Sequence, residues 1–396
     1  MSPDYPLLLD LAGRRVLVVG GGPVAARRAS LCVQAGALVD VVAPALCEDL
    51  ADLAAAGSVQ VALRGYEPGD VAGAWLVHTC TGDAPVDEAV AADADAQRVW
   101  CVRAGDADSS SAWVPAVARV DDTTVAVSAG GDPRRARAVR DAVRLDLETG
   151  ALPLRRHRPG PGRVSLVGGG PGDPGLVTTR GRRLLAEADV VVVDRLAPRA
   201  LLDTLDPDVE VVDAGKAPDR HALSQEAINR VLVEHAQAGR HVVRLKGGDP
   251  FVLGRGGEEV TACREAGVPV EVVPGVTSAF AVPAAAGVPV THRGIARSVT
   301  VATGHDALDS ASLGSSGGTL VLLMAVGRLA GTTRALVRNG RPPSTPVAIV
   351  ESGFSRAQRT TVGDLTTIAA RAEAREVRNP AVVVVGDVAR FAEEDR

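Results

Sequence analysis

The clearest chemical signal in this sequence is a glycine-rich turn, VGGGP, at residues 19–23. It follows the apolar run VLVV and reads Gly20-x-Gly22-x-x-Ala25, directly before a helix-forming segment. Gly20 permits a tight turn, Gly22 lets the backbone approach a pyrophosphate, and Ala25 allows close packing of helix on strand. Pro23 suits the first turn of a helix whose amino terminus faces the anion. The spacing therefore predicts a site for NAD or a related dinucleotide.

The adenosine half of that dinucleotide lacks its usual partner in the sequence. The second predicted strand, ALVDVVAP, ends without the acidic residue that commonly holds the ribose hydroxyls, and Asp40 lies in mid-strand. We therefore expect backbone groups around Pro44 and Ala45 to contact the adenosine half instead, and Val24 is a further expected contact of the cofactor.

The same pentapeptide recurs at residues 167–171, but its downstream neighbours differ. Gly168-x-Gly170 is followed three residues later by Asp173, where the first copy has Ala25. Further Gly and Pro residues interrupt any immediate helix. A longer, bent loop of this kind brings bare backbone against a ligand without forming a pyrophosphate cradle. The two copies therefore predict two different sites.

Three side chains have the character of acid–base groups. Asp194 ends the valine run VVVD, and an acid at the carboxyl end of a buried strand is typical of a functional crevice in an α/β fold. Among the 43 basic residues, only Lys216 and Lys246 are lysines. An ammonium group supplies a compact charge with an adjustable pKa, which guanidinium cannot. The retained lysines therefore predict a functional role for at least one of them.

Alternating strands and helices must hold these groups in place. RRVLVVG, ALVDVVAP, SVQVAL, AWLVHTCT and RVWCV predict strands separated by helices, which indicates a Rossmann-like, doubly wound parallel sheet in residues 1–149. One arginine-rich helix is predicted over 133–148, and residues 150–162, rich in Pro, Gly and Arg, predict a linker. A second α/β alternation fills residues 163–396. Its length predicts two subdomains that divide near residues 277–289, with a cleft between them.

Composition narrows the class of protein. A net charge of −5 argues against general nucleic-acid binding, and no apolar run reaches the roughly 18 residues that a membrane span needs. The amino terminus lacks the segments of a signal peptide, and the five cysteines show neither disulfide nor zinc spacing. We therefore expect a cytoplasmic protein with reduced cysteines and no membrane partner.

Several long motifs of the second half carry a resemblance to a known family. VSLVGGGPGDPGLVT, ADVVVVDRL, AGK, VVRLKGGDPFVLGRGGEE, VVPGVTSAFAVPAAAGVPVTHR, TGH and PAVVVVGDV occur in this order. This half, from residue 163 to about residue 389, resembles the uroporphyrinogen-III C-methyltransferase family. The first half, from about residue 7 to residue 148, more loosely resembles the dehydrogenase and ferrochelatase module that precedes this methyltransferase in siroheme synthases. The resemblance implies a two-subdomain tetrapyrrole methyltransferase fold after the first sheet.

The resemblance also implies a reaction: methyl groups pass from S-adenosylmethionine to pyrrole carbons of uroporphyrinogen III, which gives precorrin-2. It makes Asp194 the proton acceptor and Lys216 the proton donor, although Val193 stands where the family usually has Tyr. It places S-adenosylmethionine against Pro171, Gly247, Gly248, Asp249, Val252, Thr277, Ser278, Met324 and Gly353. Capping of a helix at Pro250 is the alternative role of Asp249.

A carboxylate-rich substrate also requires a locally basic cleft in an acidic protein. The motif residues that could form it are Arg244, Lys246, Arg255, His292 and Arg293. For Arg255 and Arg293, local pairing with Glu258 or Glu259 is the alternative.

For the first half, the resemblance implies NAD-dependent oxidation of precorrin-2 to sirohydrochlorin and leaves insertion of Fe²⁺ open. The family's catalytic aspartate aligns with Gly105, so Asp106 beside it and Ser128 are only weak candidates for metal contact. The dimerisation region is shortened, and a homodimer is expected from the resemblance alone. The sequence decides neither NAD against NADP nor the siroheme against the cobalamin branch.

Two alternatives stay open. One is a methyltransferase alone, whose first half is a degenerate binding or assembly module. The other is an RNA methyltransferase of the same broad fold, against which the acidic balance and the RLKGGDP and THR motifs argue.

Overall fold

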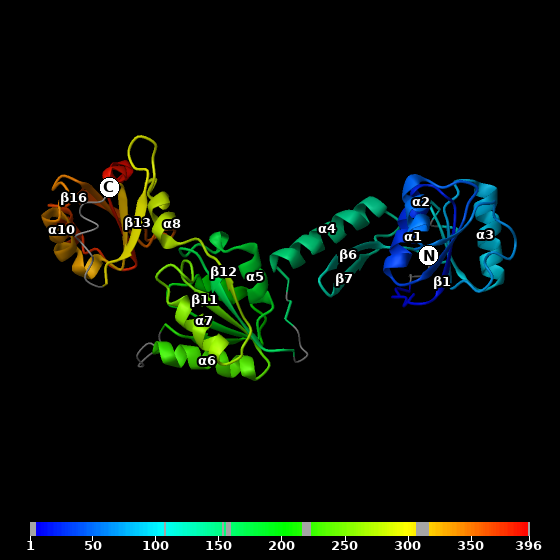
Figure 1. Cartoon of the computed structure of the whole chain (residues 1–396), viewed down its shortest axis with the longest axis horizontal. Coiled ribbons are helices and arrows are strands. Elements are labelled where there is room, and N and C mark those ends of the chain that lie inside the picture. Colours follow the sequence, from blue (N-terminus) through cyan, green and yellow to red (C-terminus); the bar gives the residue numbers. More distant parts are fainter. Residues whose placement is uncertain are drawn as a thin grey trace. The chain divides into compact units, whose positions relative to one another are not determined.

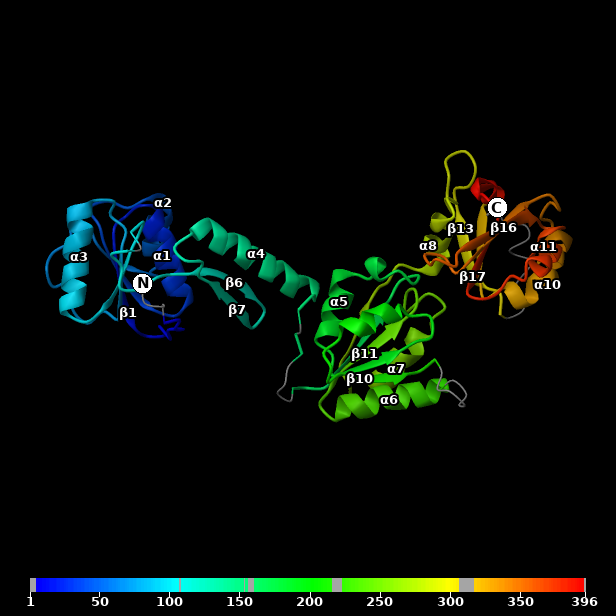
Figure 2. The same cartoon turned by 180° about the vertical axis from the view of Figure 1, so that it is seen from behind.

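The computed structural model describes residues 5–106, 108–152, 154, 155, 160–215, 223–305 and 317–394. The chain forms two compact units, Met1–Ala142 and Val143–Arg396, which Figures 1 and 2 colour from blue to teal and from green to red. Each unit has hydrophobic cores of its own and is described by itself. None of the helices in these residues is long and apolar enough to cross a membrane.

A parallel five-stranded sheet forms the centre of the first unit, in the order β3-β2-β1-β4-β5. Its strands are β1 (Arg15–Val19), β2 (Leu38–Val42), β3 (Gln60–Ala62), β4 (Leu76–Thr79) and β5 (Trp100–Arg103). Helices α1 (Pro23–Gln34) and α2 (Glu48–Ala55) cover one face, and α3 (Ala84–Ala96) covers the other (Figure 1). The predicted doubly wound sheet is confirmed. The glycine turn after β1 lies where the strand order reverses, which is the usual ligand position in such sheets.

A hairpin and a long helix follow this sheet. The hairpin joins β6 (Ala116–Val120) to β7 (Thr123–Val127), and the helix is α4 (Pro133–Thr149). Arg140 Nη1 donates a hydrogen bond to the carbonyl of Val117 at 3.1 Å, which fastens α4 to β6. The predicted arginine-rich helix is thus confirmed, and the division between the two units falls inside it.

The second unit begins with another parallel sheet, in the order β10-β9-β11-β8-β12. Its strands are β8 (Arg163–Gly168), β9 (Val190–Val193), β10 (Glu210–Asp213), β11 (His241–Lys246) and β12 (Val270–Val273). One face packs on α5 (Thr179–Ala186) and the 3-10 turns at Pro174–Leu176 and Arg199–Thr204; the other packs on α6 (Gln225–Gln237) and α7 (Gly256–Glu265). A strand covered on both faces is apolar throughout, and β9 consists of buried valines alone. The central strand β11 departs from this rule with two buried cations.

The last sheet is mixed, in the order β13-β14-β17-β15-β16. Its strands are β13 (Val299–Thr303), β14 (Thr319–Leu323), β15 (Pro346–Glu351), β16 (Arg359–Asp364) and β17 (Ala381–Val385). Helix α8 (Ser278–Ala285) and the 3-10 turn Asp387–Phe391 cover one face; α10 (Leu329–Arg338), preceded by the 3-10 turn Val326–Arg328, and α11 (Ile368–Ala374) cover the other. The change from one sheet to the next falls between β12 and α8, at the start of the predicted division.

Part of the predicted linker is held in place. The backbone N–H of Leu154 donates to the carbonyl of Ala186 at 3.1 Å, and Arg155 pairs with Asp189 at 3.1 Å and Asp206 at 3.5 Å. These contacts fix the described residues of this segment on the second unit.

Candidate functional site

Three glycine-containing loops of the second unit meet at the carboxyl ends of β8, β11 and β12. The N–H of Gly248 donates to the carbonyl of Gly170 at 2.7 Å, and the N–H of Gly170 donates back at 3.2 Å. A Cβ atom on Gly168 would lie 2.4 Å from the nitrogen of Gly275, so a larger residue could not pack there. The second VGGGP copy therefore joins the GGDP and PGVTS motifs in one place, with bare backbone at its surface.

Polar side chains of these motifs brace the loops. The carboxylate of Asp249 accepts hydrogen bonds from the N–H groups of Phe251 at 2.8 Å and Gly275 at 3.0 Å. Thr277 caps α8. Ser278 faces Gly248, since a Cβ added to Gly248 would lie 3.6 Å from the Ser278 nitrogen. Asp249 thus ties two loops together, although no α-helix begins at Pro250 as the capping alternative requires.

The remaining residues predicted for S-adenosylmethionine occupy other positions. Pro171 follows the Gly170 bridge, and Val252 is half-buried after the GGDP loop. Met324 directly follows the last residue of β14, in a left-handed conformation with φ 58°, and is 46% exposed. Gly353 packs against Val282 of α8, where a Cβ would lie 2.8 Å from a methyl group. Met324 is thus held exposed in a strained backbone conformation, which is typical of a ligand contact.

A buried cluster of charges lies beneath the end of β9. Arg244 and Lys246 are both 2% exposed and point from β11 toward Glu259 on α7, which is 0% exposed. Lys246 Nζ donates to both carboxylate oxygens of Glu259 at 3.0 Å, and Arg244 Nε donates to one of them at 3.0 Å. Arg244 Nη2 lies 3.7 Å from a carboxylate oxygen of Asp194, and Nη1 donates to the carbonyl of Val192 at 3.3 Å. The cluster connects the predicted proton acceptor to α7 through hydrogen bonds and charge.

Asp194, Arg244 and Lys246 of this cluster line a cavity of about 310 Å³, and Glu259 lies behind them. The lining residues are Asp194, Arg195, Ala214, Gly215, Leu223, Gln225, Ile228, Arg244, Lys246, Leu253, Gly254 and Arg255. Leu253 and Arg255 both have positive φ angles, 55° and 56°, so the loop before α7 is held in a strained form at this cavity. Lys216, the predicted proton donor, lies outside the described residues.

The charges of the cavity differ in how they are paired. Burial lowers the pKa of Lys246 and the Arg244 cation lowers it further, while Glu259 opposes both effects. Arg255 is exposed and binds Glu258 through two hydrogen bonds of 2.8 Å, which lower the pKa of that carboxyl. The local pairing foreseen as the alternative for Arg255 is therefore present, and it leaves Arg255 at the cavity lining.

His292 and Arg293 lie apart from this cavity, in the segment between α8 and β13. Both are exposed, and His292 stacks on Phe391 with ring centroids 5.2 Å apart. His292 Nδ1 also lies 2.8 Å from the carbonyl of Arg293. The structure thus brings Arg244, Lys246 and Arg255 together and places the other two predicted substrate residues elsewhere.

The first VGGGP copy has the geometry expected of a dinucleotide turn. Gly20 has φ 126°, and a Cβ there would lie 2.6 Å from the carbonyl oxygen of Cys80. A Cβ on Gly21 would lie 1.7 Å from the carbonyl oxygen of Ala45, and the N–H of Cys47 donates to Gly21 at 2.7 Å. Gly22, by contrast, has nothing within 4 Å of its Cβ position. The turn is packed on its inner side and bare on its outer side, so it fits a pyrophosphate at the amino terminus of α1.

The other residues predicted to contact the dinucleotide surround this turn. Pro23 is the first residue of α1, Val24 is exposed beside it, and Pro44 and Ala45 are exposed in the loop after β2. Asp40 pairs with Arg15 at 2.6 Å. Arg15 is the first residue of β1, so the Asp40 carboxylate is engaged away from the glycine turn, which follows the last residue of that strand.

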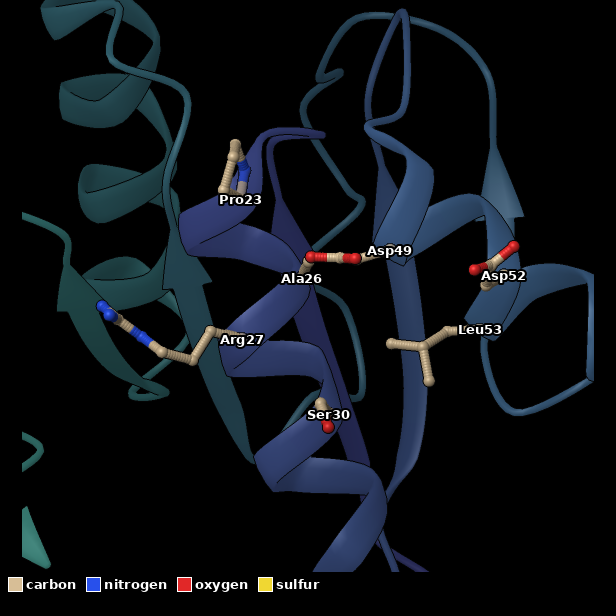
Figure 3. A pocket seen from close by; sticks show the side chains of 7 residues that line it. All are labelled: Pro23, Ala26, Arg27, Ser30, Asp49, Asp52 and Leu53. Atoms are coloured by element: carbon tan, nitrogen blue, oxygen red, sulfur yellow. The ribbon is translucent and has the colours of Figure 1, made fainter.

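A groove of about 430 Å³ runs between α1 and α2, starting at Pro23. Figure 3 shows the side chain of Asp49 pointing across it toward Ala26, while Arg27 points away from α2. A carboxylate, that of Asp49, therefore does lie near the glycine turn, but it comes from α2 and not from the end of β2, where the usual pattern has it.

The two weak metal candidates, Asp106 and Ser128, have these surroundings in the structure. Asp106 lies 3.3 Å from Arg103 Nη2 and accepts a hydrogen bond from the N–H of Ser109, while Ser128 is exposed after β7. Within the described ranges, no three His, Cys, Asp or Glu side chains are grouped so that they could hold a metal ion.

Glu259 belongs to this site although the motifs suggested it only as a possible partner of Arg255 or Arg293. A signal for it existed: Arg244 and Lys246 lie two residues apart, and so on one face, in a strand that is apolar except for these two residues and His241 at its start. Two cations that face a core need a buried anion. The nearby GRGGEE motif contains two candidates, Glu258 and Glu259. Only the packing of α7 shows that Glu259 is the buried one.

Comparison with known proteins gives consistent matches for both halves. The family of tetrapyrrole (corrin/porphyrin) methylases matches residues 163–369, and a putative NAD(P)-binding family matches residues 7–116. A siroheme synthase of Chromobacterium violaceum is 38% identical over 98% of this chain and 96% of its own length. A siroheme synthase of Pseudomonas putida is 38% identical over 99% of this chain and 97% of its own length.

A solved structure covers the second half. The uroporphyrin-III C-methyltransferase of Thermus thermophilus, complexed with S-adenosyl homocysteine, is 44% identical, covers 58% of this chain and 99% of its own, and superposes with a TM-score of 0.51. The chain is therefore similar to siroheme synthases along nearly its whole length and to a methyltransferase over its second half.

Proposed function

The chain belongs to the siroheme synthase family, and on that premise we propose that it carries two consecutive activities. The second half methylates uroporphyrinogen III with S-adenosylmethionine to give precorrin-2. The first half oxidises precorrin-2 to sirohydrochlorin with NAD. The match over nearly the whole chain favours this multifunctional enzyme over a methyltransferase with a degenerate first half. The proposal includes Fe²⁺ only as the substrate of a third step, its insertion into sirohydrochlorin.

The observation that carries the methyltransferase proposal is the cavity at Asp194. Two buried cations, Arg244 and Lys246, line it and share the single carboxylate of Glu259 behind them, so these three side chains together carry an excess positive charge. Asp194 is the one carboxylate among the described residues that line the cavity, and the lining also holds the cations Arg195 and Arg255. A carboxylate-rich macrocycle is attracted to such a wall, because charges in a poorly hydrated site interact strongly.

The chain's residues would mainly position the reactants. S-adenosylmethionine, when bound, supplies the methyl group. The three meeting loops offer backbone groups on which the cofactor can rest, with Met324 as a soft apolar contact. Asp194 accepts a proton from the methylated carbon skeleton, and Arg244 keeps its carboxylate oriented. Lys216 supplies the proton in the same proposal.

In the first half, the chain's residues would bind and orient the dinucleotide. NAD, when bound, takes up hydride. The bare side of Gly22 lets the pyrophosphate reach the N–H groups at the start of α1, whose dipole favours the anion. Pro44 and Ala45 flank the adenosine half, and Asp49 faces the groove beside it.

We also propose residues 1–149 and 163–396 as the two functional domains, joined by residues 150–162, and a homodimer as the working form. The two family models, over residues 7–116 and 163–369, support the two domains, and the dimer is expected from the resemblance alone. Sedimentation equilibrium of the purified chain tests the dimer, and a monomer at micromolar concentration contradicts it.

A stepwise absorbance assay tests the whole proposal. Uroporphyrinogen III is incubated with the full chain, and S-adenosylmethionine, NAD and Fe²⁺ are added in turn. We expect precorrin-2 after the first addition and sirohydrochlorin with NADH after the second. Methylation without NADH formation would reject the dehydrogenase and leave the methyltransferase standing.

A further inference from the structure

We propose that Glu259 is a positioning residue of methyl transfer, which acts by holding Arg244 against Asp194 at the cavity. This inference rests on the proposed methyltransferase and goes beyond it. It names a residue that does not touch the reacting atoms.

Glu259 is isolated from the cavity. Its side chain is fully buried in the first turn of α7, a helix that begins at Gly256. The positive end of the helix dipole stabilises a carboxylate there. Gln225 Nε2 of α6 adds a contact at 3.4 Å. Glu259 is therefore fixed from two helices and has no route to a ligand in the cavity.

Glu259 also fixes the position of the Arg244 guanidinium. The guanidinium has three partners: the Glu259 carboxylate at 3.0 Å, the Val192 carbonyl at 3.3 Å and the Asp194 carboxylate at 3.7 Å. Only the first is both charged and within hydrogen-bond distance. The Glu259 contact therefore sets the position from which Arg244 faces Asp194.

The charge of Glu259 offsets the two buried cations of the cluster. Lys246 and Arg244 share the single Glu259 carboxylate, with three hydrogen bonds of 3.0 Å. Neutralising Glu259 leaves two buried cations close together, and Asp194 becomes the nearest anion for both. Its carboxylate would then be drawn into the cluster and away from the cavity.

The test is a double-mutant cycle on the full chain. Glu259→Gln is made in the native sequence and in an Asp194→Ala background, and single-turnover methylation of uroporphyrinogen III is measured in each. We expect Glu259→Gln alone to lower the rate about tenfold with the Kd of S-adenosylmethionine unchanged within about twofold. In the Asp194→Ala background the same change should cost less than about twofold, because the group through which Glu259 acts is gone.

A structural role gives a different pattern. If Glu259→Gln lowers the rate by the same factor in both backgrounds, or leaves the native rate unchanged in a folded protein, the proposal is wrong. Glu265→Gln, an exposed carboxyl on the same helix, is the matched control and should leave the rate unchanged. If Glu259→Gln does not fold, Glu259→Asp keeps the charge but shortens its reach, and the same cycle is read with it. Absence of methylation by the native chain would instead reject the proposed function.

Discussion

Replacement of Gly22 by alanine should separate cofactor binding from folding in the first unit. Gly22 has φ −87° and ψ −178°, which any residue adopts, and a Cβ there meets nothing within 4 Å. The folded state therefore accepts the methyl group at a cost within about 1 kcal/mol. The added methyl group occupies the bare side of the turn, where the pyrophosphate has to approach.

The size of the binding loss follows from the contact that is blocked. A hydrogen bond from an N–H group to a charged phosphate contributes about 1.5–3 kcal/mol. Losing one such contact weakens NAD binding roughly ten- to a hundredfold. Gly21→Ala gives a contrast one residue away, because its Cβ would lie 1.7 Å from the carbonyl oxygen of Ala45. That variant should lose both NAD binding and thermal stability of the first unit.

Isothermal titration calorimetry of one sample with NAD⁺ and then with S-adenosylmethionine gives the readout. The second titration is an internal control, since its proposed site lies in the other unit. Gly65→Ala is a matched control at an exposed glycine with open space around it. A native Kd for NAD⁺ in Gly22→Ala, or an equal loss in Gly65→Ala, would refute the reasoning.

Three further predictions address single side chains. Asp194→Ala should lower methylation by roughly 10²-fold or more, and near-normal turnover would contradict its role as proton acceptor. Asp49→Ser should strengthen NADP⁺ binding about tenfold by calorimetry, because the Asp49 carboxylate faces the groove beside the adenosine half and repels a ribose phosphate; an unchanged Kd speaks against this. Burial and the Arg163 cation lower the pKa of His241 to about 4, so the unfolded chain binds more protons below about pH 6.5. The free energy of unfolding of the second unit should therefore fall by about 2–3 kcal/mol between pH 7 and pH 4.5. His241→Gln should remove this part of the pH dependence when calorimetry compares the variant with the native chain.

Local patterns were sufficient for much of the fold. Runs of apolar residues bounded by Gly and Pro predicted the parallel strands of both units, because a strand covered on both faces needs a continuous apolar sequence. Two strands, β6 and β16, lack that pattern. In β16 the buried positions include Thr360 and Thr361, so hydrophobicity does not mark the strand. Its place at the edge of the sheet becomes visible only from its pairing with β15.

Local patterns also predicted the two glycine turns and their difference. The two turns differ at the third residue after GGG, which is Ala25 in one and Asp173 in the other. This difference lies within a few neighbouring positions, and the backbone freedom of glycine is a property of the residue itself. The same is true of Asp194 at the end of its valine run. These features belong to the sequence by itself.

Only the tertiary structure decided how the charges pair. Arg244, Lys246, Arg255, Glu258 and Glu259 stand close together in the sequence, and several pairings are consistent with it. The packing of α7 turns Glu259 into the core and Glu258 toward solvent, one residue apart on the helix. The energy of an ion pair depends on burial and distance, and both are set by how α7 lies on the sheet rather than by residue type. The same reason hid Asp49, whose place in the groove depends on how α2 packs beside α1.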